Sequence, residues 1–221
     1  NAEGERFAES AMTFTLDSKP VITLGHWIPA SRQVLSDAPQ LAGHVQGRLI
    51  YGMKLKEEDQ ILNGTGASGT LNGLCNQAAA FAYGATNMTA IDALLKSLLQ
   101  VSLSFYEASG IVLHPTDWVG IQLLKDTTGQ YLFTNPQAMT EPRMWGKPVV
   151  ATPSMTQNKF LTGAFNLAAQ LWDREDATIR ISENVDDHFV RGLVCILAEE
   201  RLALTLYRAS AMVYGNLTTA G

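Results

Sequence analysis

A row of apolar residues at helical spacing is the feature that most constrains the fold of this 221-residue chain. The row consists of Leu41, Val45, Leu49, Met53, Leu55 and Leu62. Asp37 can cap a helix here, Pro39 suits its first turn, and Asn63-Gly64 ends the pattern. The predicted helix has about 24 residues and is roughly 36 Å long. Because it is longer than is usual in a compact domain, we expect it to be a spine for other elements.

Short strands and two further helices complete the predicted secondary structure. Strands are predicted at residues 12–16, 21–28, 110–113, 131–133, 148–152, 160–163, 177–182 and 211–217. Helices are predicted from Thr89, a good N-cap, to about Glu107, and over residues 115–125. Residues 190–207 contain helix formers, but their apolar residues alternate, which favours a long strand. The fold class is therefore α+β.

Composition narrows the range of functions. Hydrophobic residues make up 46% of the chain, which is enough for a core, and no apolar run approaches a membrane span. The net charge is −5 without a Lys/Arg cluster, which disfavours nucleic-acid binding as the main function. Cys75 and Cys195 lie far apart in the sequence, and we expect free thiols in a reducing compartment.

The motifs that could carry chemistry have structural explanations. Gly64, Gly66 and Gly69 fit a dinucleotide-binding pattern, but they follow a helix, whereas that motif must follow a strand. The chain's histidines lack metal-like spacing, and His114 is better explained as a polar cap of the helix that follows it. We therefore predict no catalytic, cofactor-binding or metal site, and no enzyme activity.

Glu199 and Glu200 are adjacent in the predicted long strand. Neighbouring strand residues point to opposite faces, so these two carboxyl groups cannot act as an acid–base pair on one substrate. Glu200 and Arg201 are candidates for an ion pair at an interface.

Ten short runs carry a resemblance to a known family. They are ITLGHW at 22–27, ASRQV at 30–34, DAP at 37–39, RLIYG at 48–52, LNGTG at 62–66, ASGIVL at 108–113, PQA at 136–138, MWGKPVV at 144–150, WDR at 172–174 and EERLAL at 199–204. In order and spacing, across nearly the whole chain, they resemble the Hong Kong 97-type major capsid protein of tailed double-stranded DNA bacteriophages or prophages.

The resemblance implies a domain organisation for the chain. Residues 1–20 would form the distal part of an extended β-loop, and residues 21–72 a peripheral domain with the spine helix. Residues 73–187 would form an axial domain that meets its copies around five-fold and six-fold axes. Residues 188–221 would return as strands to the peripheral domain. An N-terminal arm and a scaffolding segment would precede Asn1.

The resemblance also implies a function and partners. The protein would self-assemble through pentamers and hexamers into the icosahedral shell that encloses phage DNA. Portal, scaffold and maturation protease would act during assembly in the host cytoplasm. The virion capsid would contact packaged DNA without specificity and could carry a decoration protein. No membrane or cofactor is implied. The alternative is the shell protein of a bacterial encapsulin-type nanocompartment, which genomic context would distinguish.

One departure from the family bears on covalent cross-linking. The type member joins subunits by an isopeptide bond between a loop Lys and an Asn near the start of the long C-terminal strand, with a Glu as proton acceptor in an apolar surrounding. Glu199 matches the Glu, but Phe7 stands at the Lys position and Gly192 at the Asn position. Residues 1–18 contain no Lys, and Lys19 lies in the following turn. We expect no cross-linking and assign Glu199 no catalytic role.

Overall fold

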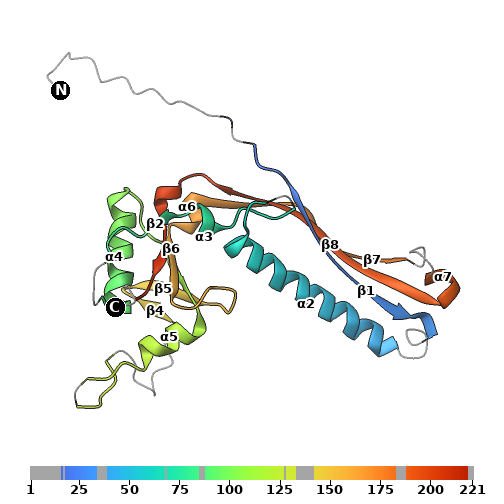
Figure 1. Ribbon diagram of the computed structural model, residues 1–221, viewed down its shortest axis with the longest axis horizontal. Coiled ribbons are helices and arrows are strands. Elements are labelled where there is room, and N and C mark those ends of the chain that lie inside the picture. The colour runs from blue at the N-terminus through green and yellow to red at the C-terminus, as the bar shows by residue number, and fades with distance from the viewer. Residues whose placement is uncertain are drawn as a thin grey trace, which may run out of the picture.

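Two parts of different shape make up the chain in the computed structural model (Figure 1). The structure describes residues 16, 18–33, 39–67, 69–84, 88–126, 128–132, 142–182 and 188–218, and of residues 39–42 only the backbone. The helices are α2 (Pro39–Asn63), α3 (Leu74–Gln77), α4 (Ala90–Leu103), α5 (Pro115–Gln122), α6 (Phe165–Ala168) and α7 (His188–Arg191), with a short 3-10 turn at Ala209–Ala211. The strands are β1 (Ile22–Ser31), β2 (Ala79–Ala80), β3 (Gly110–Leu113), β4 (Arg143–Met144), β5 (Lys147–Ala151), β6 (Lys159–Gly163), β7 (Ala169–Ser182), β8 (Leu193–Leu206) and β9 (Met212–Asn216).

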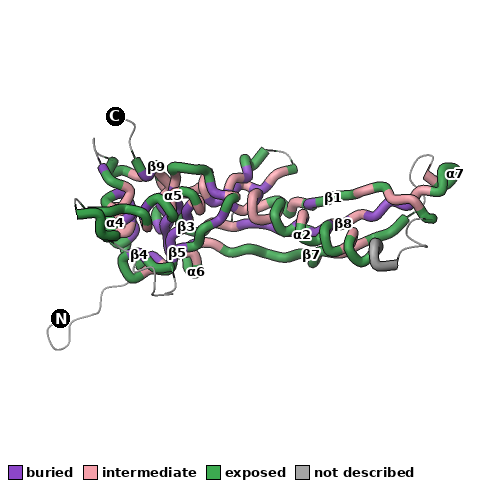
Figure 2. Tube along the Cα trace, turned by 90° about the horizontal axis from the view of Figure 1, so that it is seen from below, coloured by how far each residue is buried: buried purple, intermediate pink, exposed green. Residues whose placement is uncertain are grey.

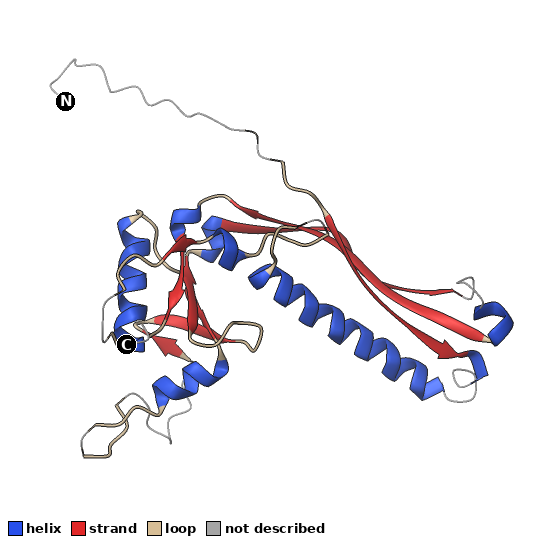
Figure 3. Cartoon of the chain, in the orientation of Figure 1, coloured by secondary structure: helices blue, strands red, loops and turns tan. Residues whose placement is uncertain are grey.

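The elongated part is a three-stranded sheet with the long helix along one face (Figure 3). The strand order is β1-β8-β7, both pairings are antiparallel, and the central strand β8 is 14 residues long. Opposite residues in an antiparallel pair share a face, so Leu24 on β1 lies on the same face as its partner Glu200. This face packs against α2.

Helix α2 confirms the predicted spine over 25 residues. Leu49 is 2% exposed, Met53 is buried as well, and both belong to the core beside the sheet. Leu55 is 40% exposed, so its place in the predicted row was wrong, since it lies only two residues beyond Met53 and turns away from that face. The side chain of Leu41 lies outside the described residues.

The second part is built on a six-stranded mixed sheet with the order β2-β9-β6-β3-β5-β4. Helix α4 packs against this sheet. Figure 2 shows buried residues gathered around β3 and β5 of the sheet. Phe160, Ile111 and Val213 are fully buried in this core. One buried polar contact joins helix and sheet: the Ser97 Oγ lies 3.0 Å from the Thr162 Oγ1 and also donates to the Leu94 carbonyl.

Contacts from the C-terminal half of α2 connect the two parts. The Thr152 hydroxyl donates to the Glu58 carboxylate, and the Asn63 amide donates to the Ser154 carbonyl over 2.6 Å. The backbone amide of Leu71 donates to the buried side chain of Gln60, which fixes the loop after the helix. The end of the spine is therefore anchored to the second part.

Several predicted elements differ from the observed ones. The helix from Thr89 ends at Leu103 instead of Glu107, because Phe105 has a φ of 65°, which no helix residue adopts. The helix predicted at 115–125 ends at Gln122. The strand predicted at 131–133 is reduced in the described part to a bridge between Tyr131 and Lys125. The predicted strand at 12–16 and Asp37 lie outside the described residues.

Strand β7 is the largest correction to the secondary structure. It begins at Ala169 instead of residue 177, and two register shifts interrupt its pairing with β8 between Asp173 and Thr178. The long strand predicted at 190–207 is confirmed as β8, after the helical turn α7.

The strand pairing also places two segments outside the domains that we predicted for them. We placed residues 169–182 in the axial segment, yet β7 pairs with β8 beside the spine helix. We expected the last strands beside that helix, yet β9 pairs with β6 and β2 in the other sheet.

Candidate functional site

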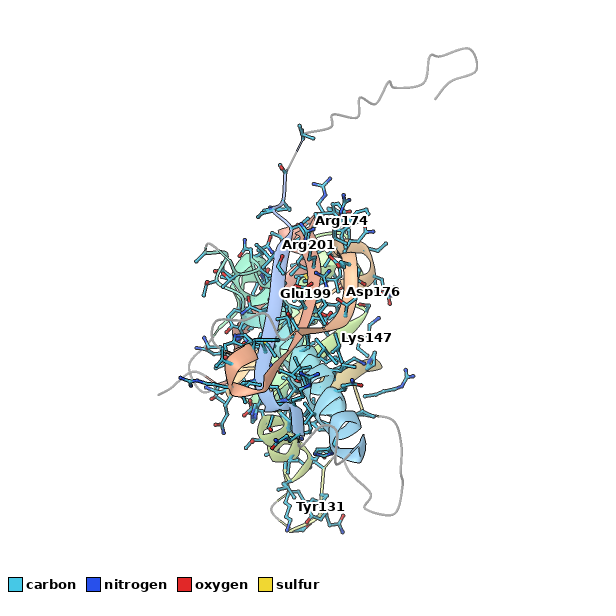
Figure 4. All side chains as sticks on the ribbon, turned by 90° about the vertical axis from the view of Figure 1, so that its right-hand side faces the viewer. Tyr131, Lys147, Arg174, Asp176, Glu199 and Arg201 are labelled. Atoms are coloured by element: carbon cyan, nitrogen blue, oxygen red, sulfur yellow. The ribbon has the colours of Figure 1, made fainter. Side chains whose placement is uncertain are left out.

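The two faces of the long sheet around Glu199 and Glu200 form the candidate site. The prediction that these carboxyl groups point to opposite faces is confirmed: Glu199 pairs with Arg180 on the outer face, and Glu200 is buried toward α2. Figure 4 shows Glu199 and Arg201 on β8 with Arg174 and Asp176 on the neighbouring β7. The two carboxyl groups cannot share a substrate.

A cation holds Glu199 on the outer face. The Arg180 Nε donates to the Glu199 Oε1 over 2.9 Å, and the Arg180 Nη2 lies 3.4 Å from the Glu175 Oε1. Thr178 on β7 lies opposite Glu199, and Gly25 is its partner on β1. Glu199 therefore has a charged and polar environment. The resemblance implies an apolar environment for the Glu that takes part in cross-linking.

Gly192 lies at the turn between α7 and β8. Its φ is +64°, and its carbonyl accepts from the backbone amide of Arg32 over 3.0 Å. A Cβ at this position would meet nothing within 4 Å, so a larger residue would fit here without a steric clash. Without a side chain, Gly192 offers no carboxamide to an attacking amine. Phe7, at the position matched to the Lys, lies outside the described residues.

Glu200 is the unusual group of the inner face. Its side chain is buried, and in the described part of the chain its Oε1 has no hydrogen-bond partner. Burial raises its pKa to about 7, with repulsion from Glu57 and Asp173 as further causes. Arg201 is exposed on the outer face and stays a candidate for an ion pair at an interface, whereas Glu200 is buried on the opposite face.

The remaining candidates have the structural roles that we predicted. His114 is the N-cap of α5, where its Nδ1 accepts from the Thr116 amide over 3.2 Å. Gly64, Gly66 and Gly69 lie in the loop after α2, not after a strand. Cys75 and Cys195 are free thiols, which confirms that they are unlinked. Over the described ranges, His, Cys, Asp and Glu form no group able to hold a metal ion.

Membrane insertion through a helix finds no support in the described part of the chain, where no helix has both the length and the apolarity to cross a bilayer.

Sequence reasoning missed two features of the site. It did not pair Arg180 with Glu199, because the two lie on different strands and the register shifts of β7 hide their proximity. It also missed the burial of Glu200. The signal for that was present: Ala198 and Leu202 lie two residues to either side and are both buried, so alternation places Glu200 on the apolar face.

Comparisons with known proteins agree with this architecture. Residues 1–217 match the phage capsid family. The chain is 46% identical over 213 residues to the major capsid protein of Enterobacteria phage HK97, a match that covers 96% of this chain and 55% of that protein. The chain thus spans about half the length of this relative.

Solved structures show the same fold at low sequence identity. The capsid of an empty GTA particle computed with C5 symmetry has a TM-score of 0.73 at 16% identity, covering 98% of this chain and 81% of that one. A structure from Gordonia phage Cozz has a TM-score of 0.71 at 15% identity, covering 98% and 79%. Both matches extend over nearly the whole chain. The chain belongs to the phage capsid family, and within it the chain is of the Hong Kong 97 type of major capsid protein.

Proposed function

We propose that the protein containing this chain self-assembles into the icosahedral shell of a phage head. The observation that carries the proposal is the 46% identity to a phage major capsid protein over 96% of the chain. That identity also favours a virion over a nanocompartment. During assembly the protein would meet a portal, a scaffold and a maturation protease, and the finished shell would touch packaged DNA and could carry a decoration protein.

The exposed apolar surface supports self-association. Phe105, just after α4, is 97% exposed, and Leu95, Leu99 and Leu103 are exposed at four-residue spacing along that helix. Aligned leucines on a free helix face are costly in water unless another surface covers them. A neighbouring copy in the same ring is the cover that shell assembly supplies.

We propose a peripheral unit and an axial unit with boundaries that follow the sheets. The peripheral unit would contain β1, α2, β7 and β8, and the axial unit the six-stranded sheet with α4 and α5. The distal β-loop would comprise residues 1–20.

We propose that the shell forms without covalent cross-links between subunits. Three features support this: Gly192 has no carboxamide, Glu199 is paired with Arg180, and residues 1–18 contain no Lys. The subunits would then be held by non-covalent contacts alone.

Assembly of the full-length protein tests the proposed function. Sedimentation and negative-stain electron microscopy at increasing protein concentration should show rings or closed shells. A full-length protein that stays monomeric at high concentration, with its native fold intact, would contradict the proposal.

A further inference from the structure

Three carboxyl groups lie where the long helix crosses the inner face of the long sheet. Glu200 is on the central strand β8 and only 6% exposed, Glu57 is half-buried on α2, and Asp173 is exposed on β7. Asp173 pairs with Leu202, which shares a face with Glu200 because strand residues two apart do so. Electrostatic repulsion from both Glu57 and Asp173 acts on Glu200. Each element of the helix–sheet contact except β1 therefore contributes one acid.

Among the residues that the structure describes, the buried Glu200 Oε1 has no hydrogen-bond partner. The cation Lys54 on α2 acts on Glu57, and it is not among the groups that shift Glu200. Strand β1 places apolar Leu24 opposite Glu200. The titratable residue of β1 on this face, His26, is exposed and lies two pairs further along. A charged Glu200 would be a buried and uncompensated anion, which is costly.

Protonation removes this cost. Burial raises the pKa of Glu200 to about 7, and repulsion from Glu57 and Asp173 adds to the rise. Burial and Asp173 also raise the pKa of Glu57, although Lys54 opposes the rise. The buried carboxyl group can therefore keep a proton near neutral pH and pack as a neutral group.

We propose that Glu57, Asp173 and Glu200 form a proton-dependent contact that fastens α2 to the long sheet while Glu200 is neutral and loosens it when all three groups are charged. The antiparallel ladders of β1, β7 and β8 do not involve these side chains, so the sheet would stay intact while the helix loosens. This control over the packing of the spine goes beyond the formation of a shell and does not depend on it.

The direction of the pH dependence follows from linkage. The pKa of Glu200 is higher in the fold than its ordinary value of 4.5, so the folded contact binds the proton more tightly than the open one. The stabilisation is complete below about pH 4.5 and is lost as the pH rises through about 7. One proton changes the opening equilibrium by at most about tenfold per pH unit.

Hydrogen–deuterium exchange of the full-length protein between pH 5 and pH 8, corrected for intrinsic exchange rates, tests the proposal. The opening equilibrium constant of amides 49–63 in α2 should rise by up to about tenfold per pH unit toward pH 7, and the amides of α4 should not change. Glu200→Gln should remove this dependence, because an amide does not titrate. The matched control Glu199→Gln should keep it. A flat profile in the wild type, or an unchanged slope in Glu200→Gln, would overturn the proposal.

A second variant keeps the test decisive if Glu200→Gln fails to fold. Glu57→Gln removes one repulsive neighbour and retains the buried Glu200. The transition should then move to lower pH and become smaller in amplitude. A Glu57→Gln profile identical to that of the wild type would count against the carboxyl cluster as its origin.

Discussion

The Arg180 Nε lies 2.9 Å from the Glu199 Oε1 on the outer face of the long sheet, whereas the adjacent Glu200 is buried on the inner face. Two neighbouring acids with the same side chain therefore have opposite surroundings. The Arg180 side chain is 64% exposed and the Glu199 side chain 21% exposed, so solvent screens the attraction between them.

The first prediction concerns this exposed ion pair. Glu199→Gln should lower the free energy of unfolding by no more than about 1 kcal/mol, as is usual for a screened surface pair. Urea denaturation of the unassembled subunit at low and high salt measures the effect, and the difference from the wild type should shrink at high salt. A loss of several kcal/mol would contradict the interpretation of this contact as a solvent-screened pair.

The second prediction concerns the two faces of α2. Leu49→Ala should destabilise the subunit by about 2–5 kcal/mol, because it leaves a cavity in the core beside the sheet. Leu55→Ala is the matched control on the same helix, and it should cost less than about 1 kcal/mol because Leu55 is exposed. Chemical denaturation of both variants decides the matter, and equal losses would show that the helix packs on another face.

The third prediction concerns the exposed leucines of α4. Leu99→Glu should leave the melting temperature of the subunit nearly unchanged, since the side chain is half exposed. It should strongly reduce ring or shell formation, because it would place a charge in an apolar contact between copies. Ser102→Glu places the same charge three residues further along the same exposed face and should also reduce assembly. If both variants assembled like the wild type in sedimentation experiments, this helix face would not be a subunit contact.

The sequence was sufficient wherever local rules decide the structure. Four-residue spacing predicted α2, and Thr89 caps α4 through a reciprocal capping box with Asp92. Alternation identified β8 as a strand although Glu199, Glu200 and Arg201 are good helix formers, because tertiary pairing overrides weak helix propensity.

The sequence failed where tertiary contacts decide. The first half of β7 was not predicted. Its residues Trp172, Asp173 and Arg174 are all exposed, and an edge strand that is exposed to solvent on both faces shows no alternation of apolar and polar residues. In α4, Leu94 is buried whereas the neighbouring Leu95 and Leu99 are exposed. One sequence cannot distinguish a leucine that its own fold covers from one that a neighbouring copy would cover.

The last prediction is that mature particles carry no covalent bonds between subunits. An isopeptide bond needs a deprotonated Lys amine to attack an Asn carboxamide, with loss of ammonia, and a carboxylate alone supplies neither reactant. Gly192 has no carboxamide, and no Lys lies within residues 1–18. Particles boiled in detergent and reductant should therefore run as a single band at the subunit mass.

A control variant sharpens this last test. Gly192→Asn restores a carboxamide, and the site tolerates it: asparagine often adopts a φ near +64°, and a Cβ there meets nothing within 4 Å. Its particles should still give a single band, because the amine is missing from residues 1–18. Ladders of subunit multiples from wild-type particles would disprove the proposal. Ladders from Gly192→Asn alone would show that a lysine outside those residues reaches the turn before β8, so that the glycine by itself prevents the bond.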